Sequence, residues 1–581
     1  MANQIDTAPS GLAAAGRFRA VLDAERVLDH SLERAIYARD GSIQRGECGL
    51  VVLPETAAEV SACMRIANEL GLTVVPRGSG TGLAGAAVPL DGAVVISLAR
   101  MRRIIEVDTE TPCAWVEPGV LNLDLTNHVR HLGLHYAPDP SSQQACSIGG
   151  NVGTNAGGPH CLSYGVTAQH VLAVEVVLYD GEVITLGGLA PDAPGFDLRG
   201  LFVGSEGTMG ITTKICVRLT PNPPAVRTML LDFPTVADGG ETVSQIIASG
   251  VVPAAIEMMD QGMIRAAEAF THAGMPTDAA AIVLVEVDGT TAQIDEEAAL
   301  VERVARAHNV RTVRIAQNDA ERDLLWKARK SAFGAMARIA PNYYLHDCVV
   351  PRTRLVEVLD EIAAIGTRHD LVIVNVFHAG DGNLHPLIAF DRRNAAQTER
   401  VMQAGEEIIR KCVAVGGVLT GEHGVGIEKR DFMPLTFNAV DLEAQACTRA
   451  AQWPADLKIA VSEACSNVVV HAYPDGMDGM LSVMMTLEGD RLVVLVQDHG
   501  VGIAPRISDS SAGLGLGLPL IAALSNEVRV RSADDGHTEV TMVFTVRDPA
   551  LLDLVKPGDK VKFEAEKADG LYVVTEIEVA R

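Results

Sequence analysis

The stretch PRGSGTGLAG, residues 76–85, decides the first domain of this chain of 581 residues. Gly80, Gly82 and Gly85 match the G-x-G-x-x-G spacing of a dinucleotide-binding turn, which needs a helix directly after the glycines. Here Pro89 and an Asp-Gly turn follow instead, and then the strand-like AVVISL. The pattern therefore favours either an anion-binding nest of inward-facing backbone amides or a plain surface loop.

Two further polar, glycine-rich stretches follow, SIGGNVGTNAGG at residues 147–158 and LFVGSEGTMG at residues 201–210. Text typical of strands and turns, such as VVLYDGEVITL, lies between them. Upstream, a capping pattern at Thr56 and Glu59 opens a predicted helix that ends at Gly71. Three glycine loops on a strand-rich domain predict one long, phosphate-bearing ligand that is held largely by the backbone.

Together these three stretches resemble the FAD-binding domain of the vanillyl-alcohol-oxidase-type flavoproteins. The similarity is most specific to the branch of FAD-linked 2-hydroxyacid dehydrogenases that contains the glycolate oxidase D subunit. It implies that the first stretch holds the FAD pyrophosphate and that the other two hold the rest, including the flavin side. Some relatives attach FAD through a histidine in the first stretch, but residues 76–89 contain none, so we expect non-covalent FAD. The expected cofactor contacts are Pro76, Arg77, Gly78, Ser79, Gly80, Thr81, Gly82, Gly149, Gly150, Asn151, Thr154, Asn155, Gly157, Gly158, Gly204, Glu206, Gly207 and Ile211.

The middle of the chain contains VIVNVFHAGDGNLHPLIAF, residues 372–390, which predicts two strands around a turn. His378 and His385 flank this turn and can converge at one end of the hairpin. Two imidazoles and a carboxylate are a common ligand set for a divalent metal, and Glu422 in GEHGVGIEK is the candidate carboxylate. Spacing alone leaves open a purely structural role for these polar residues.

HAGDGNLH and GEHGVGIEK also resemble the metal and active-site motifs of D-2-hydroxyacid dehydrogenases. The resemblance implies that His378, His385 and Glu422 bind a divalent metal, with zinc expected, and that His423 is the general base. In that chemistry the metal binds the substrate carboxylate and hydroxyl and lowers the pKa of the hydroxyl. His423, as a neutral imidazole, takes the hydroxyl proton while hydride leaves the α-carbon for flavin N5.

The segment LLWKARKSAFGAMARI predicts a helix that Asn318 and Glu321 open. Arg329 in this segment matches a family arginine that pairs with the substrate carboxylate, for which a guanidinium fork is suited. Composition alone favours a solvated helix face for the same residue. Relatives that act on 2-hydroxyglutarate carry a lysine two residues before the aspartate matched by Asp347, and here that position is Leu345. We therefore expect a small monocarboxylate substrate such as glycolate or D-lactate.

After FMPLTF the flavoprotein pattern stops, without the Asn-Pro-Gly-Lys-like segment that normally returns to the FAD domain. Residues 452–546 instead resemble the Bergerat-fold ATPases of the anti-sigma-factor serine-kinase type. The matched positions are a magnesium-binding asparagine, a polar catalytic residue, an adenine-reading aspartate and a glycine-rich phosphate lid. An ordinary α/β domain with glycine turns is the alternative. The expected ATP-site residues are Asn467, Glu463, Asp498, Gly500, Gly502, Gly513, Gly515 and Gly517.

The last segment, residues 547–581 with the strand before it, resembles the second half of a small copper-binding β-barrel of the CusF type. That family uses a Trp and two Met ligands, whereas the corresponding positions here are His537, Val540 and Met542. We therefore expect no copper binding. The segment is expected to supply strands, to pair with the ATPase-like sheet, or to be partly unfolded.

The composition limits the class of protein. A net charge of −26 argues against non-specific binding to nucleic acid or to an anionic membrane. Ten cysteines without a C-x-x-C pair exclude the usual iron–sulfur and zinc-ribbon spacings. We expect electrons to leave to a partner protein, a quinone or a dye. Because no signal peptide or long apolar run is visible, we expect a soluble, cytoplasmic protein without a transmembrane segment, or one held peripherally at the inner membrane by a partner.

These features predict an α+β multidomain protein that oxidises a small 2-hydroxy acid to the 2-oxo acid with FAD. The alternative is an ATP-binding serine kinase of the anti-sigma-factor type that acts on a regulatory protein partner. The expected parts are an N-terminal helical segment (1–47), a two-part FAD-binding domain of the vanillyl-alcohol-oxidase type (48–221), an α+β substrate cap domain with the metal site (222–438), a Bergerat α/β sandwich (439–546) and a short β tail (547–581).

Overall fold

The structure is a computed structural model that describes residues 11–190 and 197–438 and, beyond them, the backbone of six strands. The chain divides into two compact units, Met1–Asn438 and Ala439–Arg581. Among the described residues, no helix is both long and apolar enough to cross a membrane.

The first unit begins with a small sheet in which β2, β4 and β3 run parallel, in the order β1-β2-β4-β3. Strands β2 and β4 are buried along their whole length, as expected for apolar strands covered on both faces. The predicted helix is α3, whose N-cap Thr56 accepts a hydrogen bond from the amide of Glu59. The elements are α1 (Ala15–Phe18), β1 (Val27–Leu28), α2 (Ser31–Tyr37), β2 (Cys48–Val52), α3 (Ala57–Glu69), β3 (Val74–Arg77) and β4 (Ala93–Ser97).

A second, antiparallel sheet of five strands follows, in the order β5-β6-β10-β8-β9, with its own hydrophobic core. The segment VVLYDGEVITL, residues 176–186, which is predicted to form strands and a turn, belongs to the β8–β9 hairpin. The stretch at 147–158, expected as a loop, contains the short helix α5. The elements are β5 (Ile104–Asp108), β6 (Cys113–Val116), α4 (Asn122–Val129), β7 (Leu134–His135), α5 (Ile148–Thr154), α6 (Cys161–Tyr164), α7 (Thr167–His170), β8 (Val171–Val177), β9 (Val183–Gly187), α8 (Leu198–Phe202), β10 (Ile211–Arg218) and β11 (Thr220–Pro221).

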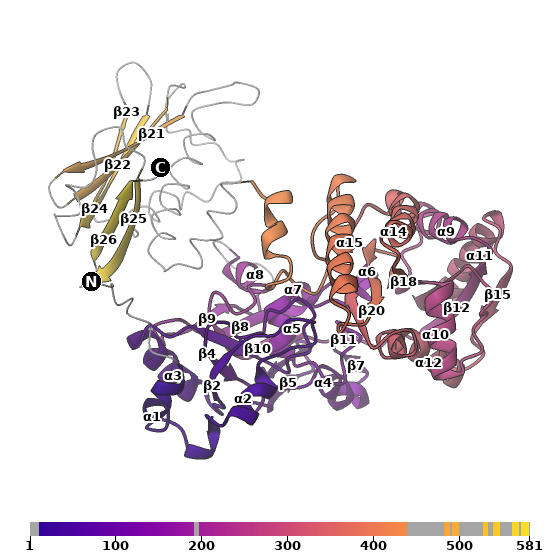
Figure 1. Ribbon diagram of the computed structural model, residues 1–581, viewed down its shortest axis with the longest axis horizontal. Coiled ribbons are helices and arrows are strands. Elements are labelled where there is room, and N and C mark those ends of the chain that lie inside the picture. The colour runs from indigo at the N-terminus through magenta and orange to yellow at the C-terminus, as the bar shows by residue number, and fades with distance from the viewer. Residues whose placement is uncertain are drawn as a thin grey trace. The chain divides into compact units, whose positions relative to one another are not determined.

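A nine-stranded sheet forms the rest of the first unit, and its main path runs β15-β12-β14-β13-β18-β19-β17. Helices α9, α11 and α14 cover one face, and α10, α12 and α13 cover the other (Figure 1). The strands are β12 (Ala225–Phe233), β13 (Ala255–Asp260), β14 (Ala281–Gly289), β15 (Thr312–Ile315), β16 (Asn342–Leu345), β17 (Cys348–Val349), β18 (Val372–His378), β19 (Asn383–Leu384) and β20 (Pro386–Phe390). The helices are α9 (Val236–Ala248), α10 (Gln261–Thr271), α11 (Thr291–Ala307), α12 (Asp319–Lys330), α13 (Ala332–Ala335), α14 (Leu355–His369) and α15 (Ala395–Ala414).

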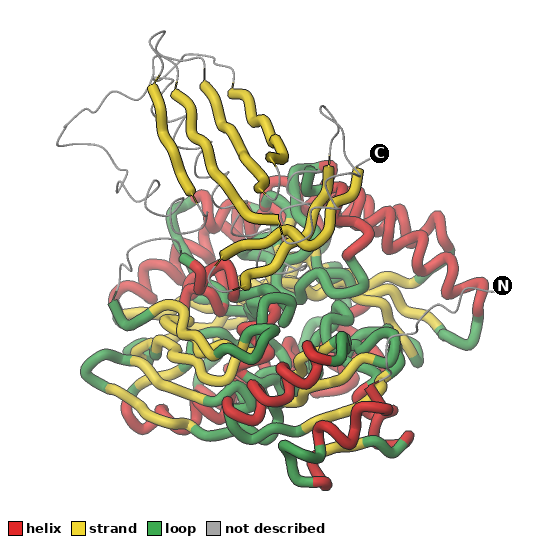
Figure 2. Tube along the Cα trace, turned by 90° about the vertical axis from the view of Figure 1, so that its left-hand side faces the viewer, coloured by secondary structure: helices red, strands yellow, loops and turns green. Residues whose placement is uncertain are grey.

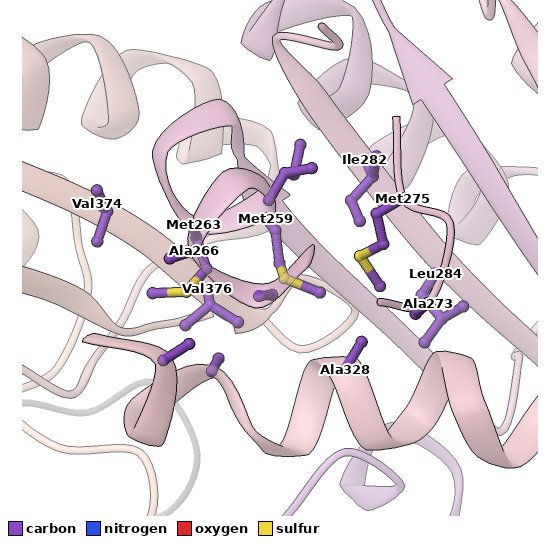
Figure 3. Packing of buried hydrophobic residues seen from close by; sticks show 14 of the residues in the cluster. Met259, Met263, Ala266, Ala273, Met275, Ile282, Leu284, Ala328, Val374 and Val376 are labelled. Carbon is purple, nitrogen blue, oxygen red and sulfur yellow. The ribbon is translucent and has the colours of Figure 1, made fainter. Parts of the chain in front are cut away.

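Helix α12 begins as predicted, because Asn318 accepts a hydrogen bond from the amide of Glu321. It ends at Lys330 rather than continuing through the predicted segment, and α13 follows after Ser331. Ala328 faces a buried cluster of methionine and aliphatic side chains from β13, β14, β18 and α10 (Figure 3). This packing fixes the rotation of α12 and hence the direction of the next residue, Arg329.

The second unit contains a six-stranded sheet in the order β21-β22-β24-β26-β25, with β23 also paired to β24. Its strands lie side by side in Figure 2 (yellow). Of the three outcomes expected for the tail, the structure has the one in which its strands join this sheet, because β26 pairs with β24. The strands are β21 (Leu481–Glu488), β22 (Arg491–Asp498), β23 (Glu527–Ser532), β24 (Thr538–Val546), β25 (Val561–Ala568) and β26 (Leu571–Val579).

Candidate active site

One cavity of about 360 Å³ is lined both by the part of the first unit that contains the glycine stretches and by residues of the nine-stranded sheet. All three glycine stretches reach its wall, and so do the five predicted metal and catalytic residues. The predicted cofactor contacts on the wall are Pro76, Arg77, Gly78, Ser79, Gly80, Thr81, Gly82, Gly149, Gly150, Asn151, Thr154, Glu206, Gly207 and Ile211. The predicted metal and catalytic residues on the wall are Arg329, His378, His385, Glu422 and His423.

The first glycine stretch presents free amides to this cavity. Within the described part of the chain, the N–H groups of residues 78–82 donate no hydrogen bond to a protein acceptor. Glycine is required where the stretches touch: a Cβ on Gly78 would lie 2.3 Å from Ser147 Oγ, and one on Gly207 2.2 Å from Pro76 Cγ. Unpaired backbone donors along a cavity fit a phosphate-bearing cofactor, so the residues present fit FAD.

Four predicted cofactor contacts lie off the cavity wall, and each has a packing role. Asn155 ends α5 in the left-handed conformation, and its side-chain oxygen accepts from the amide of Ala168. Gly204 packs against the Cβ of Asn155. Gly157 leaves room for the side chain of Glu422, and Gly158, at φ +144°, leaves room for Asp139. Glycines of these stretches therefore either line the cavity or leave room for a neighbouring side chain, and their spacing in the sequence does not distinguish the two roles.

The predicted hairpin brings the two histidines together. His378 ends β18 and His385 lies between β19 and β20, and their rings are 5.0 Å apart. Glu422 Oε1 lies 3.0 Å from His378 Nε2 and 3.3 Å from His385 Nε2. Both ring nitrogens of His385 are buried and make no hydrogen bond within the described chain. A buried orphaned imidazole beside a second imidazole and a carboxylate fits a divalent metal of the zinc type.

A second triplet, Asp347, His385 and His423, is close enough to be considered as a metal site. Asp347 is completely buried, and the ammonium of Lys429 lies 3.2 Å from its Oδ2. Burial alone would raise the pKa of Asp347, but Lys429 and the neighbouring histidines hold it well below its usual range. Because Lys429 already supplies the cation, this triplet is the weaker metal candidate.

Asp347 also shapes the loop that carries the catalytic candidates. Its carboxylate accepts from the hydroxyl of Thr420 at 2.6 Å and from the amides of Gly421 and His423 at 3.0 Å each. These bonds turn the segment so that Glu422 and His423 both face the cavity. Sequence spacing did not predict this role for Asp347.

His423 stacks on His385, with ring centroids 4.9 Å apart and planes 9° apart. Burial lowers the pKa of His423 to about 4 despite the nearby carboxylate of Asp347. Its imidazole is therefore neutral near pH 7, which is the protonation state that a general base requires.

Arg329 is almost fully buried, so the solvated helix face that composition favours is wrong. Its Nε lies 2.5 Å from Glu257 Oε2, and Glu257 Oε1 lies 2.7 Å from His378 Nδ1. Burial alone would lower the pKa of His378, but the carboxylates of Glu257 and Glu422 raise it well above its usual range. Without a metal, the His378 imidazolium thus bridges two carboxylates.

A buried charged cluster joins the two parts of the first unit beside the cavity. His160 contacts Asp139 at 2.9 Å through Nδ1 and Glu286 at 3.2 Å through Nε2. Arg322 and Trp326 also donate to Glu286. Lys330, which lines the cavity, lies 3.0 Å from Asp139.

Glu206 connects the third glycine stretch to the catalytic loop. Its carboxylate accepts from the amide of Val425 at 2.5 Å and from that of Gly426 at 2.8 Å. Glu206 itself adopts φ +53°, a conformation that non-glycine residues rarely take. Sequence reasoning assigned Glu206 to the cofactor, and the structure places its carboxylate on the loop after His423.

Several residues of the cavity wall were missed, including some that lie within the quoted glycine stretches but are not glycines. Most belong to the loop before α5 or to apolar positions that a local pattern does not distinguish from core. The additional wall residues that bear side chains near the predicted site are Ser141, Ser142, Cys146, Ser147, Phe202, Ser205, Thr212, Lys330 and Phe333.

The predicted ATP site lies almost entirely outside the described residues. Asp498 is the last residue of β22, and only its backbone is described. The residues outside the described part are Glu463, Asn467, Gly500, Gly502, Gly513, Gly515 and Gly517.

Family models match four successive parts of the chain. Residues 49–187 match an FAD binding domain, and residues 222–456 match the C-terminal domain of FAD linked oxidases. Residues 435–544 match a histidine kinase-like ATPase domain, and residues 536–579 match the copper binding periplasmic protein CusF.

Curated relatives cover most of the first unit. The glycolate oxidase subunit GlcD of Escherichia coli K12 is 46% identical over 424 residues, which are 73% of this chain and 85% of the relative. GlcD of Bacillus subtilis is 38% identical, covering 74% of this chain and 92% of the relative. A probable mitochondrial D-lactate dehydrogenase of Danio rerio is 33% identical, covering 76% and 89%.

Solved structures share the fold at low sequence identity. Substrate-bound p-cresol methylhydroxylase aligns with a TM-score of 0.65 at 19% identity, over 76% of this chain and 94% of that one. The 4-ethylphenol oxidase of Gulosibacter chungangensis aligns with a TM-score of 0.61 at 19% identity, over 74% and 92%. Together with the family models, this likeness confirms the two-part vanillyl-alcohol-oxidase-type fold. The chain is an FAD-dependent enzyme and belongs to the family of FAD-linked 2-hydroxyacid oxidases and dehydrogenases that includes the glycolate oxidase subunit GlcD.

Proposed function

We propose that this protein oxidises a small 2-hydroxy monocarboxylate, such as glycolate or D-lactate, to the 2-oxo acid. The observation that carries the proposal is the meeting of two imidazoles, a carboxylate, a neutral histidine and a buried arginine at one end of the cavity that the glycine stretches line. The names of the GlcD and D-lactate dehydrogenase relatives support the same substrate class.

Arg329 is the proposed anchor for the substrate carboxylate. The guanidinium is permanently charged and lies in the cavity wall. The position that is lysine in relatives acting on 2-hydroxyglutarate is Leu345, which is apolar and buried and gives a second substrate carboxylate no charged partner. This charge pattern favours a substrate with a single carboxylate.

Bound FAD supplies the two-electron acceptor, and a metal held by His378, His385 and Glu422 would supply a Lewis acid. His423 accepts the proton of the substrate hydroxyl, since its imidazole is neutral near pH 7. Asp347 keeps His423 at the cavity by binding its backbone amide. The side chains of Phe202 and Phe333 add apolar surface to the wall, which limits access of water to the reacting atoms.

An anaerobic titration tests the proposal. The purified protein, loaded with FAD and Zn²⁺, is mixed with glycolate or with D-lactate, and bleaching of the flavin absorbance is followed. Acetate and propionate, which bind through the same carboxylate but have no hydroxyl, are the matched controls and should cause no bleaching. Absence of bleaching with every 2-hydroxy acid tried contradicts the proposal.

A second candidate function concerns the C-terminal unit, and the ATPase-type family match carries it. We infer that this unit binds ATP with magnesium and acts on, or responds to, a regulatory protein partner. Replacement Asp498→Asn removes the proposed contact to the adenine amino group and should abolish ATP binding, measured by calorimetry. Wild-type protein that binds no ATP at millimolar concentration with magnesium contradicts this second proposal.

The reoxidising partner is a separate proposal. Because the ten cysteines include no C-x-x-C pair, we propose that electrons leave to a partner protein or a quinone rather than to an internal iron–sulfur cluster. Reoxidation kinetics with a soluble quinone measure this step directly.

A further inference from the structure

We infer that Glu257 is a positioning residue that sets both the metal ligand His378 and the carboxylate anchor Arg329. The inference rests on the proposed function, since it assigns a task to a residue behind that site. Glu257 is buried and is not part of the cavity wall. It therefore cannot touch a bound substrate, and its influence must pass through its two neighbours.

The fold brings these three residues together from separate elements. Glu257 on β13 and His378 on β18 are direct partners in the antiparallel register, so their side chains emerge beside each other. Arg329 comes from α12, which packs on the same face of the sheet through Ala328 (Figure 3). No short sequence motif contains more than one of the three.

Glu257 divides its two oxygens between its neighbours. Oε1 accepts from His378 Nδ1 at 2.7 Å, and Oε2 accepts from Arg329 Nε at 2.5 Å. Because a carboxylate offers only acceptors, Nδ1 of His378 must carry a proton. The lone pair used for a metal is then that of Nε2, which lies 3.0 Å from Glu422 Oε1.

The same contact fixes the guanidinium of Arg329. Nε and Nη2 both lie 2.5 Å from Glu257 Oε2, so Nη1 is the group left available to a substrate carboxylate. The Arg329 and Glu257 side chains are 1% and 0% exposed and that of His378 is 5% exposed, so no bulk water can replace a lost contact. Glu257 thus holds two groups that bind different parts of the site.

The replacement Glu257→Gln tests this arrangement, because an amide has one acceptor and one donor. Its NH₂ group must face either Arg329, which only donates, or His378 Nδ1, which forces the proton onto Nε2. We expect the dissociation constant for Zn²⁺ to rise about 10–100-fold in the second case. In the first case the KM for glycolate should rise about tenfold. Zn²⁺ binding is measured by competition with a chromophoric chelator on the FAD-loaded protein.

Two further variants separate positioning from general stability. Glu257→Asp keeps both acceptors and should fall between wild type and Glu257→Gln; it decides the question if the glutamine variant does not fold. The matched control is Asp232→Asn, since Asp232 is equally buried and divides its oxygens between Arg311 and Thr312 away from the cavity. It should lower the melting temperature without changing Zn²⁺ affinity or KM.

The outcomes distinguish the inference from the function on which it rests. Wild-type protein that neither binds Zn²⁺ nor bleaches with glycolate removes the proposed function, whatever Glu257 does. Wild-type protein that does both, together with Glu257 variants unchanged in Zn²⁺ affinity and KM, overturns the inference alone. Equal changes in Asp232→Asn also overturn it, because the effect would then be a general loss of rigidity.

Discussion

The glycine end and the histidine end of the cavity are built in opposite ways for the ligand groups proposed to bind there. At the glycine end the backbone amides of residues 78–82 are the unpaired donors, and at Gly78 a side chain is excluded because its Cβ would lie 2.3 Å from Ser147 Oγ. At the histidine end side chains line the cavity, and the buried carboxylates of Glu257 and Asp347 hold the ring of His378 and the backbone of His423. Binding by the backbone is thus encoded locally, whereas binding by side chains depends on the tertiary fold.

The replacement His423→Asn should have the largest effect and should act on one end only. Loss of the base is expected to lower the rate of flavin bleaching about 10²–10⁴-fold, while FAD stays bound. Anaerobic stopped-flow absorbance measures the rate, and the flavin spectrum measures occupancy. His369→Asn is the control, because His369 pairs with Glu407 and is not part of the cavity wall. Loss of FAD from the His423 variant would show that the two ends of the cavity do not act independently.

Replacement Gly207→Ala should act on the other end. Its Cβ would lie 2.2 Å from Pro76, and the residue adopts φ +78°, so the two stretches must separate. Overpacking of this kind costs about 1–3 kcal/mol, and we expect FAD affinity to fall about tenfold or more. Fluorescence titration of the apoprotein with FAD measures this affinity. Gly16→Ala is the control, since nothing lies within 4 Å of its added Cβ, and equal FAD affinity in Gly207→Ala and wild type would contradict the packing argument.

Glu206 belongs to the third glycine stretch and binds the loop after His423, so Glu206→Gln tests how far the two ends of the cavity depend on each other. The glutamine oxygen replaces only one of the two carboxylate oxygens that accept from the Val425 and Gly426 amides, so one hydrogen bond to a partly buried amide is lost at a cost of about 0.5–1.5 kcal/mol. We expect the bleaching rate to fall about tenfold, with a smaller change in FAD affinity. A variant that loses FAD but keeps its rate per bound flavin would assign Glu206 to the cofactor instead.

The pH dependence of stability tests the cluster that joins the two parts of the first unit. Burial alone would lower the pKa of His160, but Asp139 and Glu286 raise it to about 10. The folded pKa thus lies above the unfolded value, so this stabilisation is complete below pH 6.5 and is lost as the pH rises through about 10. We expect wild type to lose on the order of 1–3 kcal/mol of unfolding free energy between about pH 7 and pH 9 through this group.

His160→Gln should remove that part of the pH dependence, and denaturant titrations at several pH values measure it. The variant should be less stable than wild type at neutral pH and should approach it at alkaline pH. Parallel pH profiles for the two proteins would show that His160 does not titrate in this range.

The sequence predicts the glycine end because glycine spacing is a direct consequence of backbone approach. It also predicts the hairpin histidines, since one turn brings His378 and His385 together. Prediction from the sequence fails where glycines are compatible with either a loop or a helix. The glycines of residues 147–158 predict a loop, yet the backbone there forms α5, because Ser147 caps it and Val152 packs into the core.

The residues behind the histidine end could not be predicted from local patterns. Glu257 lies in the short strand AIEMMD, which also ends on the acidic Asp260, and only the pairing of β13 with β18 shows that Glu257 faces His378. Asp347 gains its role from a loop more than seventy residues later in the chain, which no periodicity connects to it. Arg329 was correctly placed at the cavity only through family resemblance, because its helix is otherwise strongly charged.

The buried ammonium of Lys429 bears on how a metal would leave and re-enter the proposed site of His378, His385 and Glu422. The ammonium is a counter-ion of Asp347 that a chelator cannot remove. Asp347 in turn holds the 420–423 loop through hydrogen bonds from Thr420 and Gly421. Demetallation should therefore be reversible, leaving a preformed vacancy that refills without refolding of the loop. The stoichiometry should stop at one ion per chain in the first unit, because the neighbouring triplet already contains its own permanent positive charge.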